Sequence, residues 1–170
     1  LLLQDNGIIK LREDVGITAT IKDIEENPKN IEFKEVEAAQ IPSILPDVDY
    51  AVINSNYAIQ AKLSPTEDSL LIEGSSSEYS NLVGVKAGRE NEDIINALKA
   101  ALESKEVSDF IENEYKGEII GVVENPGDGF DPTIDYDSLK GQKITIAASP
   151  APHSEILEIV KDILAEKDIT

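Results

Sequence analysis

Apolar side chains recur at helical spacing in two neighbouring stretches of the chain. Both place them three or four positions apart, at Ile94, Ile95, Leu98 and Leu102 and then at Val107, Phe110, Ile111 and Tyr115. This spacing predicts two amphipathic helices that meet near Ser104, with Gly117 as the C-terminal cap of the second. A further helix is expected from about 153 to 166.

Shorter helices or turns are predicted earlier in the chain. They cover residues 1–4, 37–45 and 57–63. Thr20 and Asp23 have the spacing of a capping box, in which each side chain bonds the backbone of the other residue, so a short helix should begin there. Because the chain starts inside an apolar, helix-forming segment, we expect it to be part of a longer protein.

Compact apolar runs between the helices predict β-strands. They lie at 50–53, 70–72, 82–85, 119–123 and 143–147, and a further strand is expected from about 30 to 36. Strands that alternate with helices are typical of an α/β fold with mainly parallel sheets. Ligands of such folds bind beyond the carboxyl ends of the strands, which directs attention to residues 54–57 and 149–153.

The composition of the chain limits its classes of partner and chemistry. The chain has 170 residues, of which 41% are hydrophobic. Its 34 acidic and 15 basic side chains give a formal net charge of −19. The length suits one domain with a real core, and the charge argues against binding to nucleic acid or anionic lipid, because phosphate contacts need a basic face. The absence of cysteine excludes disulfides, thiolate metal sites and cysteine nucleophiles.

Residues 124–140 differ in composition from their surroundings and are predicted to form a linker. Turn-forming residues are concentrated there, together with the acids Asp128, Asp131, Asp135 and Asp137. These acids lack the glycine and the closing glutamate at the positions that a calcium-binding EF-hand loop requires. We therefore expect solvated side chains here, and neither a metal ion nor a cofactor.

Asn54 and Asn56 are the strongest candidate ligand contacts. An asparagine at the end of a strand presents an acceptor and two donor hydrogens, which suit the carboxylate and ammonium groups of a zwitterion. Each residue is also suited to cap the helix that follows, and the spacing leaves both roles open. Tyr57 stands beside them in the same segment.

His153 is the only histidine and stands at the start of a predicted helix, behind two prolines. Backbone N–H groups at such a position can receive a carboxylate, and the positive helix end favours a neutral imidazole. Ser149 and Ser154 lie nearby, but the nucleophile-elbow pattern of hydrolases is absent. His153 is either a ligand contact or a polar loop residue. The residues alone thus indicate a small-ligand receptor, or an enzyme whose key residues lie elsewhere.

Ordered motifs run through the first 120 residues. They include Glu26-Asn27-Pro28-Lys29-Asn30, Glu37-Ala38-Ala39-Gln40-Ile41-Pro42, Asp49-Tyr50-Ala51-Val52-Ile53-Asn54-Ser55-Asn56-Tyr57-Ala58 and Tyr115-Lys116-Gly117. In this order they resemble the second half of the methionine-binding lipoproteins, the substrate-binding components of bacterial methionine ABC importers. Residues 143–157 resemble the beginning of the same family. The order is thus inverted, as in a junction of tandem copies or in a circular permutant.

The resemblance implies a type II periplasmic-binding-protein-like α/β fold with two lobes, present only in part. Residues 1–123 would be the C-terminal half of a substrate-binding domain, with 1–74 in the second lobe and 80–123 returning to the first. Residues 124–140 would be the linker, and 141–170 the first strand and helix of a following or permuted domain. Exchange of this last segment between two copies would allow domain-swapped self-association.

The resemblance also implies a function without catalysis. The protein would bind methionine, or another small amino acid or short peptide, and deliver it to an ABC permease and its ATPase. It would be extracytoplasmic, at the cell surface or in the periplasm, and lipid-anchored. Asn54 would contact the bound amino acid, joined by Asn56, Tyr57 and His153. Because other contacts of the family, an arginine among them, precede the matching segment, we expect this chain alone to bind methionine weakly or not at all.

Overall fold

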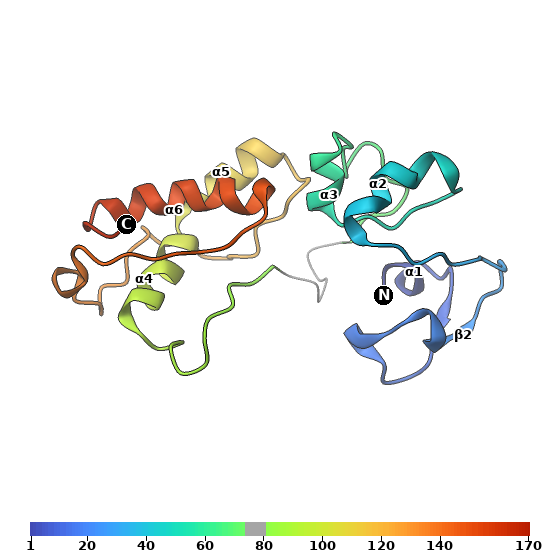
Figure 1. Ribbon diagram of the computed structural model, residues 1–170, viewed down its shortest axis with the longest axis horizontal. Coiled ribbons are helices and arrows are strands. Elements are labelled where there is room, and N and C mark those ends of the chain that lie inside the picture. The colour runs from blue at the N-terminus through green and yellow to red at the C-terminus, as the bar shows by residue number, and fades with distance from the viewer. Residues whose placement is uncertain (74–80) are drawn as a thin grey trace. The chain divides into compact units, whose positions relative to one another are not determined.

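The computed structural model describes residues 1–73 and 81–170 and divides the chain into two compact units, Leu1–Leu82 and Val83–Thr170 (Figure 1). The predicted lobe boundaries at 74 and 80 lie outside the described residues. Helices dominate both units, and the described residues contain a single two-stranded sheet. None of the helices found in these ranges has the length and apolar character that a membrane crossing requires.

The first unit begins with helix α1 (Leu2–Asp5) and a short antiparallel pair of strands, β1 (Lys10–Leu11) and β2 (Ile24–Glu26). Helix α1 begins and ends one residue later than the predicted segment 1–4, its C-cap is Asn6, and Gly7 follows with a positive φ of +67°. The backbone N–H of Leu11 donates to Gln4 Oε1 at 2.7 Å, which ties this helix to the sheet.

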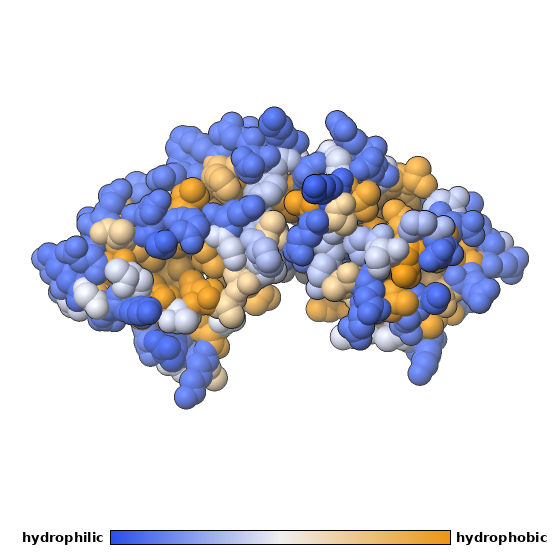
Figure 2. Space-filling view, turned by 45° about the horizontal axis from the view of Figure 1, so that its top comes forward, coloured by the Kyte–Doolittle hydropathy of each residue, from blue (hydrophilic) through white to orange (hydrophobic). Residues whose placement is uncertain are grey.

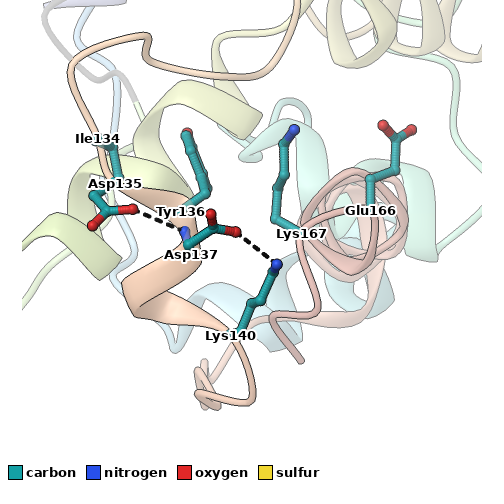
Figure 3. Close-up of a pocket in the computed structure, with 7 residues that line it drawn as sticks. All are labelled: Ile134, Asp135, Tyr136, Asp137, Lys140, Glu166 and Lys167. Atoms are coloured by element: carbon teal, nitrogen blue, oxygen red, sulfur yellow. Dashed lines mark hydrogen bonds and ion pairs between the residues drawn. The ribbon is translucent and has the colours of Figure 1, made fainter.

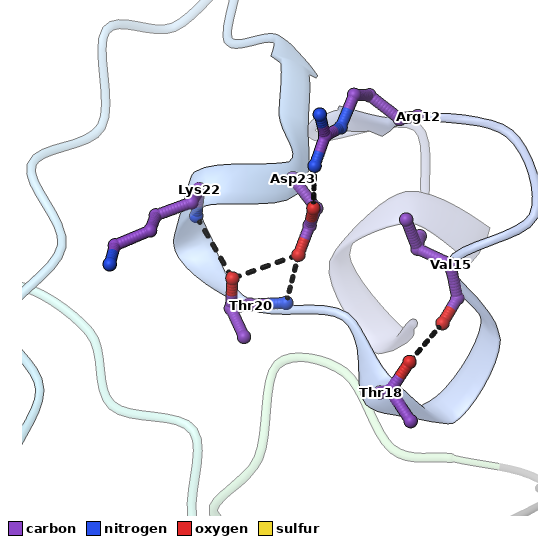
Figure 4. A network of polar contacts seen from close by, with 6 residues as sticks. All are labelled: Arg12, Val15, Thr18, Thr20, Lys22 and Asp23. Carbon is purple, nitrogen blue, oxygen red and sulfur yellow. Dashed lines mark hydrogen bonds and ion pairs between the residues drawn. The ribbon is translucent and has the colours of Figure 1, made fainter.

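A capping box precedes β2, as the sequence predicts (Figure 4). Asp23 Oδ2 accepts hydrogen bonds from Thr20 N at 2.9 Å and from Thr20 Oγ1 at 2.8 Å, and Thr20 Oγ1 accepts from Lys22 N at 3.3 Å. Asp23 also pairs with the Arg12 guanidinium. Hydrogen bonding to Arg12, and then to Thr20, lowers the pKa of Asp23 from 3.8 to about 2. The predicted helix is a single 3₁₀ turn, Ile21–Asp23, because the chain enters β2 directly.

Three consecutive short helical turns occupy the predicted segment 37–45: Ala38–Gln40, α2 (Ile41–Ile44) and Leu45–Asp47. Pro42 and Pro46 lie in the first turns of the last two, where a missing N–H costs no hydrogen bond. Helix α3 (Ser55–Gln60) begins two residues before the predicted start. The unit buries few side chains among its described residues, namely those of Leu11, Ala58 and Pro65.

The second unit is built around helices α4 (Asp93–Leu102), α5 (Lys105–Tyr115) and α6 (Glu155–Ala165). The sequence predicts all three, the first two from their apolar spacing, and α6 packs against both of the others (Figure 1). Their apolar faces form one core together with Leu139, which precedes α6, and Ile169, which follows it. The core consists of Ile94, Ala97, Leu98, Ala101, Val107, Leu139, Val160, Ile163, Leu164 and Ile169. Residues on both sides of the predicted linker thus share a single core.

The apolar side chains of segment 124–140 pack onto this core. Leu139 belongs to the core, and Phe130 and Tyr136 lie against it. The two aromatic rings meet edge to face with centroids 5.5 Å apart, and Lys167 Nζ lies 4.5 Å from the centroid of the Phe130 ring. Three of the four acids of the segment are exposed, namely Asp128, Asp135 and Asp137. The expected solvation therefore holds for most of the acids and is wrong for the apolar side chains.

Two glycines fix the path of this segment beside the junction of α4 and α5. Gly127 N donates to Glu103 O at 3.0 Å, and Gly127 O accepts from Lys105 N at 2.7 Å. Gly129 has a φ of +93°, and a Cβ at this position would lie 2.9 Å from Ile163 Cγ2. Both the backbone conformation and the close approach of α6 therefore require glycine at 129.

The predicted parallel sheet is not formed by the described residues. Segments 30–36, 50–53, 70–72, 82–85, 119–123 and 143–147 lack regular strand pairing within the ranges that the structure describes. At the start of the last of them, Ile144 N donates to Thr170 O at 2.7 Å and Thr170 N donates to Gln142 O at 3.0 Å. Outside these segments a parallel bridge joins Ser104 to Gly127. Strand prediction fails here because a strand needs a neighbour to take up its backbone hydrogen bonds.

Large apolar side chains are exposed where these segments lie unpaired. Val52 is 57% exposed, Leu70 is 79% exposed and Leu82 is 85% exposed. Hydrophobic surface is visible on both units in Figure 2. The segments have the composition of buried strands, and within the described ranges they lack the sheet that would bury them.

Candidate functional site

Asn54 occupies the N-cap position of α3, but its side chain does not cap the helix. Its backbone carbonyl accepts the first helical hydrogen bonds, from Tyr57 N at 3.0 Å and Ala58 N at 3.1 Å. The side chain is exposed, and it has no hydrogen-bond partner in the described part of the chain. Between the two roles that the sequence leaves open, the geometry disfavours capping and leaves the amide of Asn54 available to a ligand.

Asn56 and Tyr57 lie in the first turn of α3 and are half-buried. Tyr57 lines a shallow pocket of about 360 Å³ between α2 and α3, together with Ala39, Pro42, Ser43, Gln60 and Ala61. Asn54 and Asn56 are not among the lining residues of this pocket. The structure therefore brings the three residues together along one helix turn, but not into one cavity.

His153 lies in the turn Pro150–Ser154 that leads into α6, and it is half-buried. Its Nδ1 is 2.5 Å from Ser149 Oγ. Ser154 holds the same turn, because its Oγ donates to Ser149 O at 2.9 Å and its N donates to Ser149 O at 3.1 Å. Pro152, which precedes His153 in this turn, is almost completely buried. The histidine is thus fixed by a local hydrogen bond that the sequence analysis did not anticipate.

A tyrosine–carboxylate pair anchors the first turn of α6. The hydroxyl of Tyr115, at the end of α5, donates to Glu155 Oε2. Burial, and then the hydrogen bond to Glu155, raises the pKa of Tyr115 well above its usual range. The spacing of the sequence gives no sign of this contact, because the two residues lie in different helices.

A second, polar hollow in the second unit is lined by acidic and basic side chains, two of which form an ion pair (Figure 3). It is lined by Ile134, Asp135, Tyr136, Asp137, Lys140, Glu166 and Lys167. Lys140 Nζ lies 2.6 Å from Asp137 Oδ1, and this contact lowers the pKa of Asp137 and raises that of Lys140. Across residues 1–73 and 81–170, no group of three or more metal-ligating side chains is close enough together to hold a metal ion.

The four predicted ligand contacts are divided between the two units. Asn54, Asn56 and Tyr57 belong to the first unit and His153 to the second. Asn54 offers an unpartnered amide, whereas His153 is already held by Ser149. Hydrogen-bonding groups of this kind recognise a small polar ligand without any covalent step.

The family of the chain follows from its first 123 residues, which match the family model of the NlpA lipoproteins. The chain belongs to the NlpA lipoprotein family. A Bacillus subtilis relative named methionine-binding lipoprotein MetQ is 39% identical to it over 127 residues, 72% of this chain and 46% of the relative. The chain thus spans about half the length of the curated relatives it matches.

Solved structures of similar proteins agree with this assignment. A nutrient-binding protein from Burkholderia cenocepacia bound to methionine has 43% sequence identity and a TM-score of 0.64, over 70% of this chain and 51% of that chain. Protein PG110 from Staphylococcus aureus has 28% identity and a TM-score of 0.61, over 95% of this chain and 55% of that chain. The predicted family is confirmed, and so is the type II periplasmic-binding-protein fold, which is present only in part.

Proposed function

We propose that the chain is the methionine-binding part of an extracytoplasmic, lipid-anchored protein that delivers this amino acid to an ABC permease and its ATPase. The observation that carries the proposal is the likeness to the Burkholderia protein, whose structure holds methionine. The MetQ name of the Bacillus relative supports the same ligand. Recognition by hydrogen bonds and apolar contacts requires no catalytic group, so we propose that the protein is not an enzyme.

In this proposal Asn54 makes the principal contact to the ligand. Its free amide supplies both a donor for the carboxylate and an acceptor for the ammonium group of an amino acid. Asn56 and Tyr57 are proposed as neighbouring contacts from the same helix turn, and His153 as a contact from the second unit. No cofactor or metal ion takes part.

The proposed lobe assignment follows the predicted boundaries. Residues 1–74 are assigned to the second lobe and 80–123 to the first, with 124–140 as a connection to the strand and helix of 141–170. The shared core of α4, α5 and α6 supports placing 141–170 in the same lobe as 80–123. Exchange of this segment between two copies stays a prediction. The inverted order of the segments stays a prediction too, either as a tandem junction or as a circular permutant.

Titration of the ¹⁵N-labelled chain with methionine, followed by NMR, tests the proposed function. We expect the side-chain amide of Asn54, identified by its loss in Asn54→Ala, to shift on addition of L- or D-methionine. Because the chain spans about half the length of its relatives, the expected affinity is weak, with a Kd of about 1 mM or above.

Asn125→Ala is the matched control, because it removes an exposed asparagine amide outside the proposed site. In this variant the backbone amides of Asn56 and Tyr57 should shift on addition of methionine as in the unmodified chain, whereas in Asn54→Ala they should not shift. Equal shifts with alanine and methionine would contradict recognition of the methionine side chain. Chemical conversion of methionine during the titration would favour the alternative of an enzyme.

A further inference from the structure

Residues 124–140, here called the clasp, contact α6 and the junction of α4 and α5 at the same point. Gly127 forms a parallel bridge with Ser104, which lies at that junction. Two positions later, a Cβ at Gly129 would lie 2.9 Å from Ile163 Cγ2 of α6 and 3.5 Å from Ser104 Cβ. The backbone of the clasp therefore touches the two sides of the core together.

The aromatic side chains of the clasp contact the chain just after α6. Phe130 and Tyr136 meet edge to face, with their ring centroids 5.5 Å apart. Lys167, which follows α6, has its Nζ 4.5 Å from the centroid of the Phe130 ring and 5.7 Å from that of the Tyr136 ring. Figure 3 shows Tyr136 and Lys167 in this arrangement. Directly beyond the clasp, Gly141 N donates to Asp168 O at 2.8 Å.

The clasp contacts differ from the core contacts in what an exchange of residues 141–170 between two copies would do to them. An exchanged α6 would pack on α4 and α5 of the second copy and regain its core contacts there. The clasp would have to extend from one copy to the other. Gly129 could not stay against both Ser104 and Ile163 of its own chain, because that Ile163 would lie on the second copy. The clasp contacts therefore stabilise only the closed, unexchanged chain.

We propose that the clasp closes the second unit within one chain, and that its release lets α6 dock on α4 and α5 of a second copy. The docking surface is the apolar face that these two helices turn towards α6. Tyr115 supplies its polar contact, because its hydroxyl donates to Glu155 in the first turn of α6. The clasp does not include Asn54, so this dimer is independent of the proposed ligand.

Substitution of Gly129 separates the two forms. The Cβ of Gly129→Ala would overlap Ile163 in the closed chain, whereas an extended clasp has no such contact. Each full-length protein is unfolded, refolded and sedimented at about 0.01–1 mM, up to the effective concentration of a tethered partner. We expect the unmodified chain to be monomeric. Gly129→Ala should form dimers at a concentration at least about tenfold lower, the effect of one overpacked contact.

Gly88→Ala is the matched control. Gly88 has a φ of +89°, close to the +93° of Gly129, but the described residues place no atom within 4 Å of a Cβ at position 88. The control therefore introduces the same backbone strain outside the clasp, and it should stay monomeric. Equal dimerisation of the two variants, or a Gly129→Ala protein that folds and stays monomeric, would overturn the proposal.

Phe130→Ala is the second variant, because it removes the contact with Lys167 without adding an atom to the core. It should dimerise as Gly129→Ala does. If Gly129→Ala does not fold, a monomeric Phe130→Ala overturns the proposal on its own.

Contacts between chains identify the surface that the dimer uses. In a dimer refolded from equal amounts of ¹³C-labelled and unlabelled chain, isotope-filtered NMR should show Tyr115 of one copy close to Glu155 of the other. The contact of Phe130 with Lys167 should be lost. A dimer without the Tyr115–Glu155 contact between chains would overturn the proposal, and so would an unmodified chain that shows this contact.

Discussion

The two units of the chain differ in how much of their apolar surface they bury. The second unit encloses ten core residues between three helices, and Ala97, Ala101 and Ile169 have no exposed surface at all. Among the described residues of the first unit, only Leu11, Ala58 and Pro65 are buried. The sequences are similarly apolar, so the contrast does not come from composition alone.

The contrast shows what helices and strands each need from their neighbours. A helix satisfies its own backbone hydrogen bonds and needs only one packed face, which α4, α5 and α6 give each other. A buried strand needs partners at both edges and cover on both faces. Segments 50–53 and 70–72 of the first unit have neither within the described residues, so Val52 and Leu70 are exposed.

The largest loss of stability is expected from truncation of Leu98. Leu98 is 2% exposed in the core of the second unit, and Leu98→Ala should lower the free energy of unfolding by about 2–5 kcal/mol. Leu70→Ala makes the same chemical change at a side chain that is 79% exposed, and should cost less than about 0.5 kcal/mol. Urea denaturation followed by circular dichroism measures both, and similar losses would contradict the difference between the units.

The N-cap residues Ser104 and Asn54 should also differ in their contribution to stability. Ser104 is buried and its Oγ accepts a hydrogen bond from Val107 N at 3.2 Å, so Ser104→Ala should cost about 1 kcal/mol. Asn54→Ala should change the stability by less than about 0.5 kcal/mol, because the side chain makes no capping bond. A loss of about 1 kcal/mol in Asn54→Ala, measured by the same denaturation, would assign Asn54 to capping instead of ligand binding.

The smallest expected effect is the acid dependence of the first unit. The pKa of Asp23 is about 2, below its usual 3.8, so its pairing with Arg12 stabilises the fold above pH 3.8 and is lost as the pH falls towards 2. Asp23→Asn should remove this part of the pH dependence. Glu13→Gln, at an exposed carboxylate, is the control and should retain it. Hydrogen exchange of β1 and β2 amides between pH 5 and 2 measures the difference, and equal profiles for all three proteins would refute it.

Local sequence patterns were sufficient to predict the helices of this chain. The apolar spacing predicted α4 and α5, a helix was also expected where α6 lies, and the pair Thr20 and Asp23 predicted a capping box that the structure contains. The strands β1 and β2 were missed because each is too short to show an alternating pattern. The predicted parallel strands depend on distant partners, which a local pattern does not specify.

The sequence was sufficient to predict which residues are candidates for the site, but not which atoms those residues contact. The sequence showed Asn54 directly after a predicted strand and the single histidine in a predicted loop. Whether Asn54 caps its helix depends on the orientation of its side chain, which the spacing does not determine. The contact of Ser149 with His153 spans four positions across two prolines, and no regular periodicity predicts it.

The core of the second unit also has a consequence for folding kinetics. Its helices α4 and α6 are far apart in the chain, so the unit has a high contact order and should fold more slowly than a bundle of sequential helices. The hydrogen bonds of Gly127 to Glu103 and Lys105 divide the intervening chain into two shorter loops. Because each shorter loop costs less entropy to close, we expect this contact to form early in folding.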